Sequence, residues 1–265
     1  MKPCFATRVV RSVWCVTLLA AALTARAQET TNGFAFTDFL LAPLRIHLLT
    51  STNEPTIHTT LTSNDVTRIL GKVNHVWAQA GITFYLESLR IEPAVNTEGF
   101  RDHVKTNSDA LLRLRPESSK ATNVFHVYFL KQFGPNGICI RGINFVKDTA
   151  SLRPVEGGLD EPLPRVTSHE LGHALTLPHR QDVTNLLASG MSGAWLNESE
   201  IKQAREAAQT KPWIQTAPDV WKNADALRIA NQPVEARRLW QHVTHLPLNC
   251  DATRHARKRV EEQAK

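Results

Sequence analysis

The sequence predicts an α/β (α+β) domain in which a sheet packs against helices. Three observations predict this class. Residues 43–49 alternate apolar and polar positions as a strand does, residues 64–77 repeat apolar positions at spacings of three and four as a helix does, and residues 82–86 form a second apolar run. A strand, a helix and a strand in this order predict two parallel strands joined by a right-handed crossover.

The first of these elements, PLRIHLL, places the aliphatic residues at positions 44, 46 and 48 on one face. The helix that follows is expected to begin with Ser63 or Asp65 as its N-cap and to end at Gly81. Its apolar stripe consists of Val66, Ile69, Leu70, Val73, Val76 and Trp77.

The central part of the chain predicts two more strands and a second long helix. Residues 92–122 are polar and predict a loop with one short helix around residues 108–114. NVFHVYFL (residues 123–130) is apolar on both faces, which is typical of a central strand. CIRGINFV (residues 139–146) predicts another strand, entered through the turn-rich GPNG. The second long helix is expected to begin near Pro164, because proline is favoured in a first turn.

The remaining sequence predicts only helices and turns. Asn197, with Glu200 three residues later, predicts the capping box of a helix that reaches about residue 208. Beyond it the sequence predicts two or three amphipathic helices with the spacing of a degenerate tetratricopeptide unit. We therefore divide the chain into a main domain, residues 28–208, and a helical appendage, residues 209–265.

Residues 1–27 have the pattern of a secretory signal peptide. Basic residues precede an apolar run at residues 13–25, and Ala25-Arg26-Ala27 has the small-x-small form of a cleavage site. A membrane anchor is the alternative, but this run is shorter than the roughly 20 residues that span a bilayer. We therefore expect a secreted or periplasmic protein, cleaved near Ala27, with no stable membrane span.

Charge and cysteine content agree with export. The sequence has 31 Lys and Arg against 25 Asp and Glu, and the predicted leader holds four of the basic residues and none of the acidic ones. The mature balance, 27 against 25, gives no reason to expect a nucleic-acid partner. Cys139 and Cys250 remain after cleavage and either form one disulfide or stay as two free thiols.

Residues 166–180, VTSHELGHALTLPHR, hold three histidines and one glutamate. On a helix, His169 and His173 lie one turn apart on the same face, where both imidazoles can bind one ion. His179 follows a proline that prevents the helix from continuing, and a turn there can return its imidazole to the same ion. Three nitrogen ligands and one open position are typical of catalytic zinc. Glu170 lies beside the ligands without being one.

Two alternatives apply to this site. The downstream segment NESE (residues 197–200) is similar to the stretch that supplies a glutamate ligand in thermolysin-like peptidases, but the capping box already accounts for its carboxylates. Histidines on a helix surface without any metal are the other alternative. We prefer His179 as the third ligand, and we expect the histidines outside the motif to lie in solvent or in hydrogen-bonded core positions.

HELGHALTLPH (residues 169–179) resembles the extended zinc motif of the metzincin metallopeptidases, H-E-x-x-H-x-x-G-x-x-H. Residues 69–87 resemble the first helix and second strand of matrixin-like and pappalysin-like members, and residues 123–130 resemble the strand before their active-site region. The resemblance spans about residues 43–206, of which only the zinc motif is specific. It implies a twisted mixed sheet of about five strands, one catalytic Zn²⁺ below its edge strand, and peptide-bond hydrolysis.

Two positions depart from the metzincin pattern. Thr176 occupies the place of the usual glycine, and a β-branched residue disfavours the positive φ of a sharp helix exit, so we expect the turn before His179 to be built differently. The family's methionine-containing turn reads NLL (residues 185–187) here. We expect Met191 to form the hydrophobic floor below the metal, with Leu187 as the alternative.

The resulting expectation is a secreted zinc metalloendopeptidase, a hydrolase whose partner is a protein or peptide substrate. Zinc lowers the pKa of its water toward about 7, and Glu170 acts as general base and then protonates the leaving amine. A peptide would lie along a sheet edge, for which residues 139–146 are the candidate, and the resemblance places residues 192–196 at the pocket after the scissile bond. A secreted binding protein with a vestigial zinc site and a zinc hydrolase of non-protein substrates are the alternatives.

Overall fold

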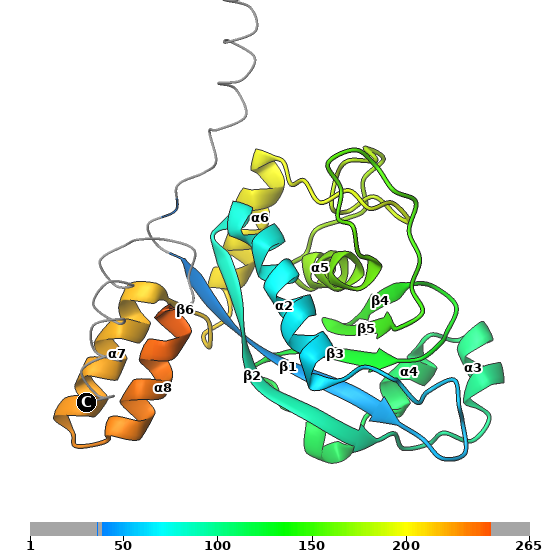
Figure 1. The fold of residues 1–265 in the computed structure, drawn as a ribbon, viewed down its shortest axis with the longest axis horizontal. Coiled ribbons are helices and arrows are strands. Elements are labelled where there is room, and N and C mark those ends of the chain that lie inside the picture. The colour runs from blue at the N-terminus through cyan, green and yellow to red at the C-terminus, as the bar shows by residue number, and fades with distance from the viewer. Residues whose placement is uncertain (1–35, 37–38, 245–265) are drawn as a thin grey trace, which may run out of the picture. The chain divides into compact units, whose positions relative to one another are not determined.

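The computed structural model describes residue 36 and residues 39–244 of the chain. Its strands form one twisted mixed sheet in the order β2-β1-β3-β5-β4, with the short β6 paired to β1 (Figure 1). The predicted α/β (α+β) class is confirmed. The strands are β1 (Leu40–Thr50), β2 (Ile82–Pro93), β3 (Phe125–Leu130), β4 (Gly137–Ile140), β5 (Ile143–Lys147) and β6 (Gln215–Thr216).

The helices of the described residues lie between and after these strands. The longer ones are α2 (Ser63–Trp77), α5 (Pro162–Ala174), α6 (Glu198–Gln209), α7 (Ala217–Ile229) and α8 (Pro233–Thr244). The shorter ones are α3 (Phe100–Thr106), α4 (Asp109–Arg113) and the 3-10 turns η1 (Ala78–Ala80) and η2 (Glu117–Ser119). The short helix expected around residues 108–114 corresponds to α4, whereas α3 was not predicted.

The first strand, helix and strand form as expected. β1 pairs in parallel with β2, and it also pairs in parallel with β3 on its other side. Leu44, Ile46 and Leu48 share one face of β1 and are buried in a core with residues of α2, α5 and α6. On the opposite face, a second apolar cluster packs residues of α3 and α4 against β3 and β5.

The caps of two helices differ in how well the sequence predicted them. The N-cap of α2 is Thr62 and not Ser63, because the Thr62 side chain accepts from the Asp65 backbone N–H and Asp65 accepts in return from Thr62. At the other end, α2 stops at Trp77 and η1 continues to Gly81, which is left-handed with φ 60°. For α6 the predicted capping box of Asn197 and Glu200 is confirmed.

Residues 139–146 form a hairpin, and their prediction as one strand is wrong. β4 and β5 pair antiparallel, and between them Arg141 and Gly142 have φ of 53° and 79°. Two successive left-handed residues are typical of a tight hairpin turn, but arginine is an unusual first residue for it. The apolar spacing therefore gave no sign of the reversal. β4 is an edge strand of the sheet and β5 is internal, so only the first half of this segment offers a free edge.

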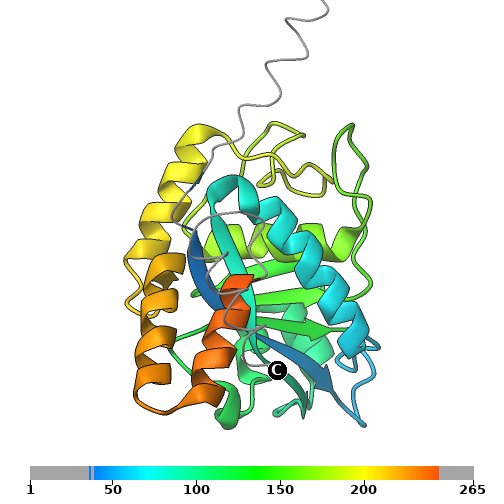
Figure 2. The same ribbon diagram turned by 60° about the vertical axis from the view of Figure 1, so that its left-hand side comes forward.

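The C-terminal helices α7 and α8 form a hairpin, which Figure 2 shows beyond the end of α6. They have an apolar core of their own, to which Leu41 of β1 and Phe39, just before β1, contribute. The other buried members are Ala217, Val220, Ala224, Ala236, Trp240 and Val243. Burial of Phe39 and Leu41 against this hairpin connects it to the sheet of the main domain.

Several predictions concern residues outside the described part of the chain. These are the signal peptide at residues 1–27, the last helix of the appendage, and Cys250 as a disulfide partner. Cys139 is half-buried on β4. Within the part of the chain that is described, none of the helices combines the length and the apolar character that a membrane crossing requires.

Two histidines outside the motif are hydrogen-bonded core residues, as expected. His47 Nδ1 lies 2.7 Å from Glu92 Oε1, His47 Nε2 lies 2.9 Å from His126 Nδ1, and His126 Nε2 lies 2.7 Å from the Ala121 carbonyl oxygen. Burial lowers the pKa of both rings, and that of His47 falls to about 2. This chain of contacts joins β1, β2 and β3 on the face away from α5.

Candidate metal centre

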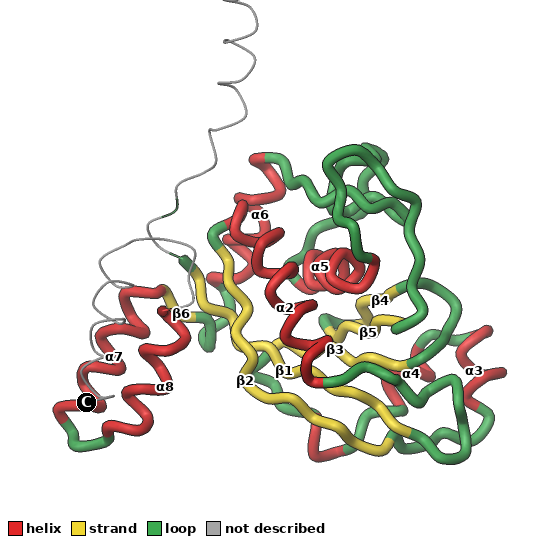
Figure 3. Tube along the Cα trace, in the orientation of Figure 1, coloured by secondary structure: helices red, strands yellow, loops and turns green. Residues whose placement is uncertain are grey.

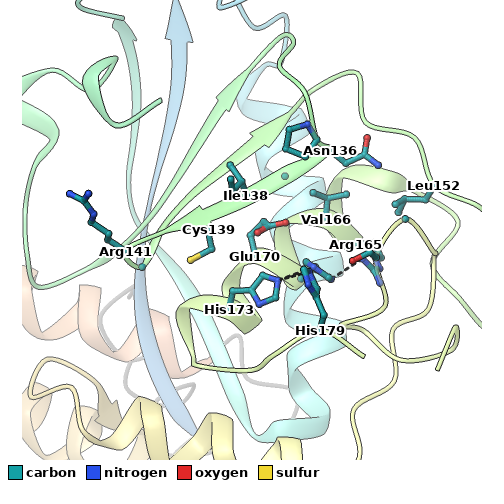
Figure 4. Close-up of a pocket in the computed structure, with 16 residues that line it drawn as sticks. Asn136, Ile138, Cys139, Arg141, Leu152, Arg165, Val166, Glu170, His173 and His179 are labelled. Carbon is teal, nitrogen blue, oxygen red and sulfur yellow. Dashed lines mark hydrogen bonds between the residues drawn. The ribbon is translucent and has the colours of Figure 1, made fainter. Parts of the chain in front are cut away.

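Helix α5 carries the first two histidines of the motif. It begins at Pro162, and most of its residues are buried because the helix lies between the sheet and two long loops (Figure 3). Those loops, residues 148–161 and 180–197, are joined by backbone hydrogen bonds, among them Arg153 N–H to the Gly190 carbonyl at 2.9 Å. His169 and His173 both line a cavity to which β4 also contributes, and Figure 4 shows His173 in it.

The turn that follows α5 returns His179 to the other two histidines. The Leu177 N–H bonds to the Gly172 carbonyl at 2.9 Å, and the Thr176 N–H bonds to the His173 carbonyl at 2.9 Å. This pair of bonds defines a Schellman motif, whose left-handed position is Thr176 with φ 69°. The expectation of a differently built turn is therefore wrong: the chain uses the usual left-handed exit with a threonine in place of glycine. Gln203 supports it by donating to the Thr176 carbonyl at 2.7 Å.

Replacing Thr176 with Gly should stabilise the protein. A β-branched residue in the left-handed region costs about 1–3 kcal/mol, and the extra freedom of glycine in the unfolded chain offsets part of that gain. We expect the free energy of unfolding of the metal-free protein to rise by about 1 kcal/mol in urea titrations. Asn231→Gly is the matched control, because Asn231 also has a positive φ, 60°, but asparagine tolerates it. An equal gain in both variants would contradict strain at Thr176.

The three histidines present their Nε2 atoms to one another. His173 Nε2 lies 3.0 Å from His169 Nε2 and 3.1 Å from His179 Nε2. His169 Nδ1 lies 2.8 Å from the Leu186 carbonyl oxygen, and His173 Nδ1 lies 2.7 Å from the Leu177 carbonyl oxygen. Because a carbonyl only accepts, these two Nδ1 atoms carry the protons, and in a neutral ring Nε2 then holds a lone pair.

Burial keeps the rings in this neutral state. It lowers the pKa of His169 to about 3, with a further contribution from the positive charge of Arg165, and it also lowers the pKa of His173. Two neutral Nε2 atoms 3.0 Å apart cannot hydrogen-bond when neither carries a proton. Their lone pairs instead converge on one point, as a cation would require. The His169, His173 and His179 group can therefore hold a metal ion.

Glu170 lines the same cavity, which has a volume of about 560 Å³. Figure 4 shows its carboxyl group pointing toward β4 beside the histidines. Burial raises the pKa of Glu170 to about 8, while the charge of Arg165 and a hydrogen bond from the Cys139 backbone act in the opposite direction. A cation among the imidazoles would also lower this pKa, because it favours the ionised carboxylate.

Gly137 of β4 allows the Glu170 side chain to take this position. A Cβ atom at Gly137 would lie 2.6 Å from Glu170 Oε1 and 2.6 Å from Val166 Cγ1. Only a residue without a side chain permits this approach of β4 to α5. The sequence contained the glycine within the GPNG turn but gave no sign of this contact.

Replacing Gly137 with Ala should displace the Glu170 carboxyl group while leaving the three histidines in place. If Glu170 takes part in chemistry, a misplacement of about 1 Å lowers the turnover rate by roughly 100-fold. We expect bound metal, measured by elemental analysis, to be unchanged. Gly134→Ala is the control, since no atom lies within 4 Å of a Cβ there. Equal activity of the two variants would show that the position of Glu170 does not matter.

Leu187, the alternative to Met191 as the hydrophobic floor, packs against α5 next to the site. Leu187 is fully buried, and its Cδ1 would lie 3.2 Å from a Cβ placed at Gly172, between the two helical histidines. Met191 is half-buried and forms an isolated bridge with Arg153 in the loops. The aliphatic side chain in the NLL turn therefore occupies the space under α5.

Glu200 supports the turn below the site and is no part of the histidine group. Its carboxylate is fully buried and accepts hydrogen bonds from Arg180 Nε at 2.6 Å, Asn185 Nδ2 at 2.8 Å and the Asn197 N–H at 2.9 Å. Donors of the protein thus occupy three of the roughly four acceptor positions of this carboxylate. The capping-box interpretation of this segment is confirmed.

Arg165 is a buried residue that the sequence analysis missed. It lies one helical turn before His169, with Nη1 3.1 Å from His169 Nδ1, and it is only 2% exposed. Its Nε donates to the Gly193 carbonyl at 3.0 Å, and Nη2 donates to the carbonyls of Asn185 and Ala188. Arg165 thereby fixes the loop that carries the Leu186 carbonyl. The spacing of four residues before His169 was the only available signal.

The wall of the cavity differs from the expectation in one segment. Ser189 and Gly190 line it, together with Leu152 of the neighbouring loop. Residues 192–196, expected at this wall, do not line the cavity. Ser192 is instead buried and accepts a hydrogen bond from the Val155 N–H at 2.9 Å, so it joins the two loops.

Comparison of the sequence with known protein families gives no family that matches it. A search of curated proteins likewise gives no match.

Proposed function

We propose that the protein is an exported zinc-dependent endopeptidase of metzincin type. The observation that carries the proposal is the convergence of three Nε2 atoms, from His169, His173 and His179, in a cavity that also contains Glu170. A zinc–nitrogen bond of about 2.0–2.1 Å in tetrahedral geometry separates the nitrogens by roughly 3.3 Å. The separations of 3.0 and 3.1 Å in the structure are close to this value.

The chain's own residues supply the ligands and the proton acceptor. His169 and His173 are oriented by the Leu186 and Leu177 carbonyls, which fix the tautomer that leaves Nε2 free. Bound zinc supplies Lewis acidity, which lowers the pKa of water and polarises a carbonyl group. Glu170 accepts the proton of the attacking water at a carboxylate oxygen and later delivers it to the departing amine.

The edge strand β4 offers a place for an extended peptide. It pairs with β5 on one side only. Its residue Gly137 lies close to the Glu170 side chain. An extended peptide that adds to this free edge receives backbone hydrogen bonds, which fix its position without selecting its side chains. This arrangement favours peptide-bond hydrolysis over reactions on compact substrates, because the free edge of β4 forms one wall of the cavity.

An unbiased peptide mixture tests the proposal. The mature protein, incubated with zinc, should cleave peptides in the mixture, and a chelator should abolish the cleavage until zinc is restored. Metal analysis of the same samples gives the zinc content independently of activity. Bound zinc without any cleavage would favour a binding protein, and hydrolysis restricted to non-peptide esters or amides would favour the other hydrolase class. Cleavage that persists after complete removal of the metal would contradict the proposal.

A further inference from the structure

A second cavity, of about 420 Å³, lies next to the metal centre and is lined by cationic side chains. We call it the basic cavity. Its lining includes four cations and no carboxylate; the cations are Arg115, Lys120, Arg141 and Lys211. They come from three separate segments of the chain: the loop around η2, which carries Arg115 and Lys120, the β4–β5 turn, and the segment after α6. Convergence of cations from distant segments concentrates positive potential in one hollow.

Two of these cations have carboxylate partners outside the cavity. Lys120 pairs with Glu117 at 2.5 Å, and Arg141 pairs with Asp109 at 2.9 Å. Both pairs are largely exposed, and exposed pairs contribute little energy that an incoming ligand would have to replace.

The other two cations, Arg115 and Lys211, are half-buried and have no carboxylate within ion-pair distance among the described residues. Arg115 Nε donates to the Leu112 carbonyl at 3.2 Å. The Lys211 Nζ atom lies 5.5 Å from the centre of the Phe125 ring and 5.7 Å from that of Trp213. Their charges therefore remain available to an anion that enters the cavity.

The basic cavity adjoins the cavity of the metal centre at the Arg141 end of β4. Arg141 and Gly142 line both cavities, and the successive residues His173 and Ala174 line one cavity each. Figure 4 shows Arg141 beyond Cys139, away from the three histidines. Cys139, whose backbone hydrogen-bonds to Glu170, is separated from Arg141 by a single residue, Ile140. A peptide that pairs with β4 over the metal centre therefore reaches the basic cavity within a few residues.

We propose that the basic cavity is a specificity site that binds an acidic side chain of the substrate peptide, a few residues from the scissile bond on the side toward Arg141. The inference rests on the proposed peptidase function. The substrate carboxylate lies among the four cations, and its methylene groups pack against Phe125 and Trp213. Charge complementarity of this kind selects substrates and increases the rate of encounter.

Cleavage of matched peptides tests this site. We expect the unbiased mixture to show Asp and Glu enriched at one position on one side of the cleaved bond. For a peptide with Glu at that position, kcat/KM should exceed that of its Gln counterpart by about fivefold, and added salt should reduce this ratio. The ratio should fall to about one in Lys211→Gln. In Lys211→Glu it should fall below one, and a Lys-containing peptide should become the better substrate.

Controls separate this inference from the proposed function. Lys202→Gln removes one exposed charge on α6 outside both cavities and should keep the Glu-to-Gln ratio, and thermal unfolding checks that every variant is folded. Cleavage without any acidic preference, or a preference that Lys211→Glu leaves intact, overturns the basic cavity as a specificity site while the peptidase function stands. If no peptide is cleaved, fluorescence anisotropy with glutamate-rich and glutamine-rich labelled peptides decides. Tighter binding of the glutamate-rich peptide that Lys211→Glu reverses supports the cavity, and equal binding of both peptides overturns it.

Discussion

Replacing Glu170 with Gln should lower peptide cleavage by roughly 100- to 10,000-fold and leave the metal bound. A general base contributes to the rate by this factor, and glutamine has the same shape but cannot accept the proton. His169 and His173 do not depend on Glu170 for their orientation, because it comes from the Leu186 and Leu177 carbonyls. The loss should therefore appear in kcat, with zinc content near that of the wild type.

Glu206→Gln is the matched control for this variant. Glu206 is exposed on α6, away from the cavity, and its loss should change neither turnover nor metal content. Wild-type cleavage by the Glu170 variant would refute its role as the base. Loss of zinc together with activity would show that Glu170 supports the metal instead.

Replacing His179 with Ala should weaken zinc binding by at least about 100-fold. Substitution of a residue that only orients a ligand costs 10- to 100-fold in affinity, and removal of the ligand itself should cost more. Competition with a chromophoric chelator gives the zinc dissociation constant of each variant. His75→Ala is the control, since His75 is exposed on α2 outside the site. Equal zinc affinity in the His179 variant and the wild type would exclude His179 as a ligand.

The sequence predicted the grouping of the histidines and the first strand, helix and strand, because both follow from local spacing. The spacing of His169, Glu170 and His173 determines which side chains share a helical face, and this local geometry survives in any fold that keeps the helix. The position of His179 depends on a turn of a few residues after α5. Backbone hydrogen bonds close this turn in the structure. The parallel pairing of β1 and β2 followed from the order of strand, helix and strand.

The features that the sequence missed depend on contacts between distant segments. The β4–β5 reversal uses arginine at a position where asparagine or aspartate is the usual signal, so its apolar flanks looked continuous. Whether Leu187 or Met191 packs against α5 depends on which loop residue contacts Gly172. The buried position of Arg165 depends on carbonyls some twenty or more residues along the chain. Periodicity carries no information about such contacts.

The prediction for the turn at Thr176 was wrong although its steric reasoning was correct. The steric penalty of a left-handed threonine is real, but it amounts to about 1–3 kcal/mol. Burial of Leu175 and Leu177 on either side of Thr176 favours the same turn, as do the Schellman hydrogen bonds and the Gln203 contact. Together these interactions outweigh the penalty, and the local preference of one residue does not decide the backbone.

The position of the metal in a crystal of the zinc-soaked protein tests the central claim most directly. Diffraction data collected at the zinc absorption edge should show one strong anomalous peak about 2.0–2.1 Å from the Nε2 atoms of His169, His173 and His179. A peak bound by the first two histidines while the His179 ring points into solvent, or one with the Glu200 carboxylate as a ligand, would contradict the account.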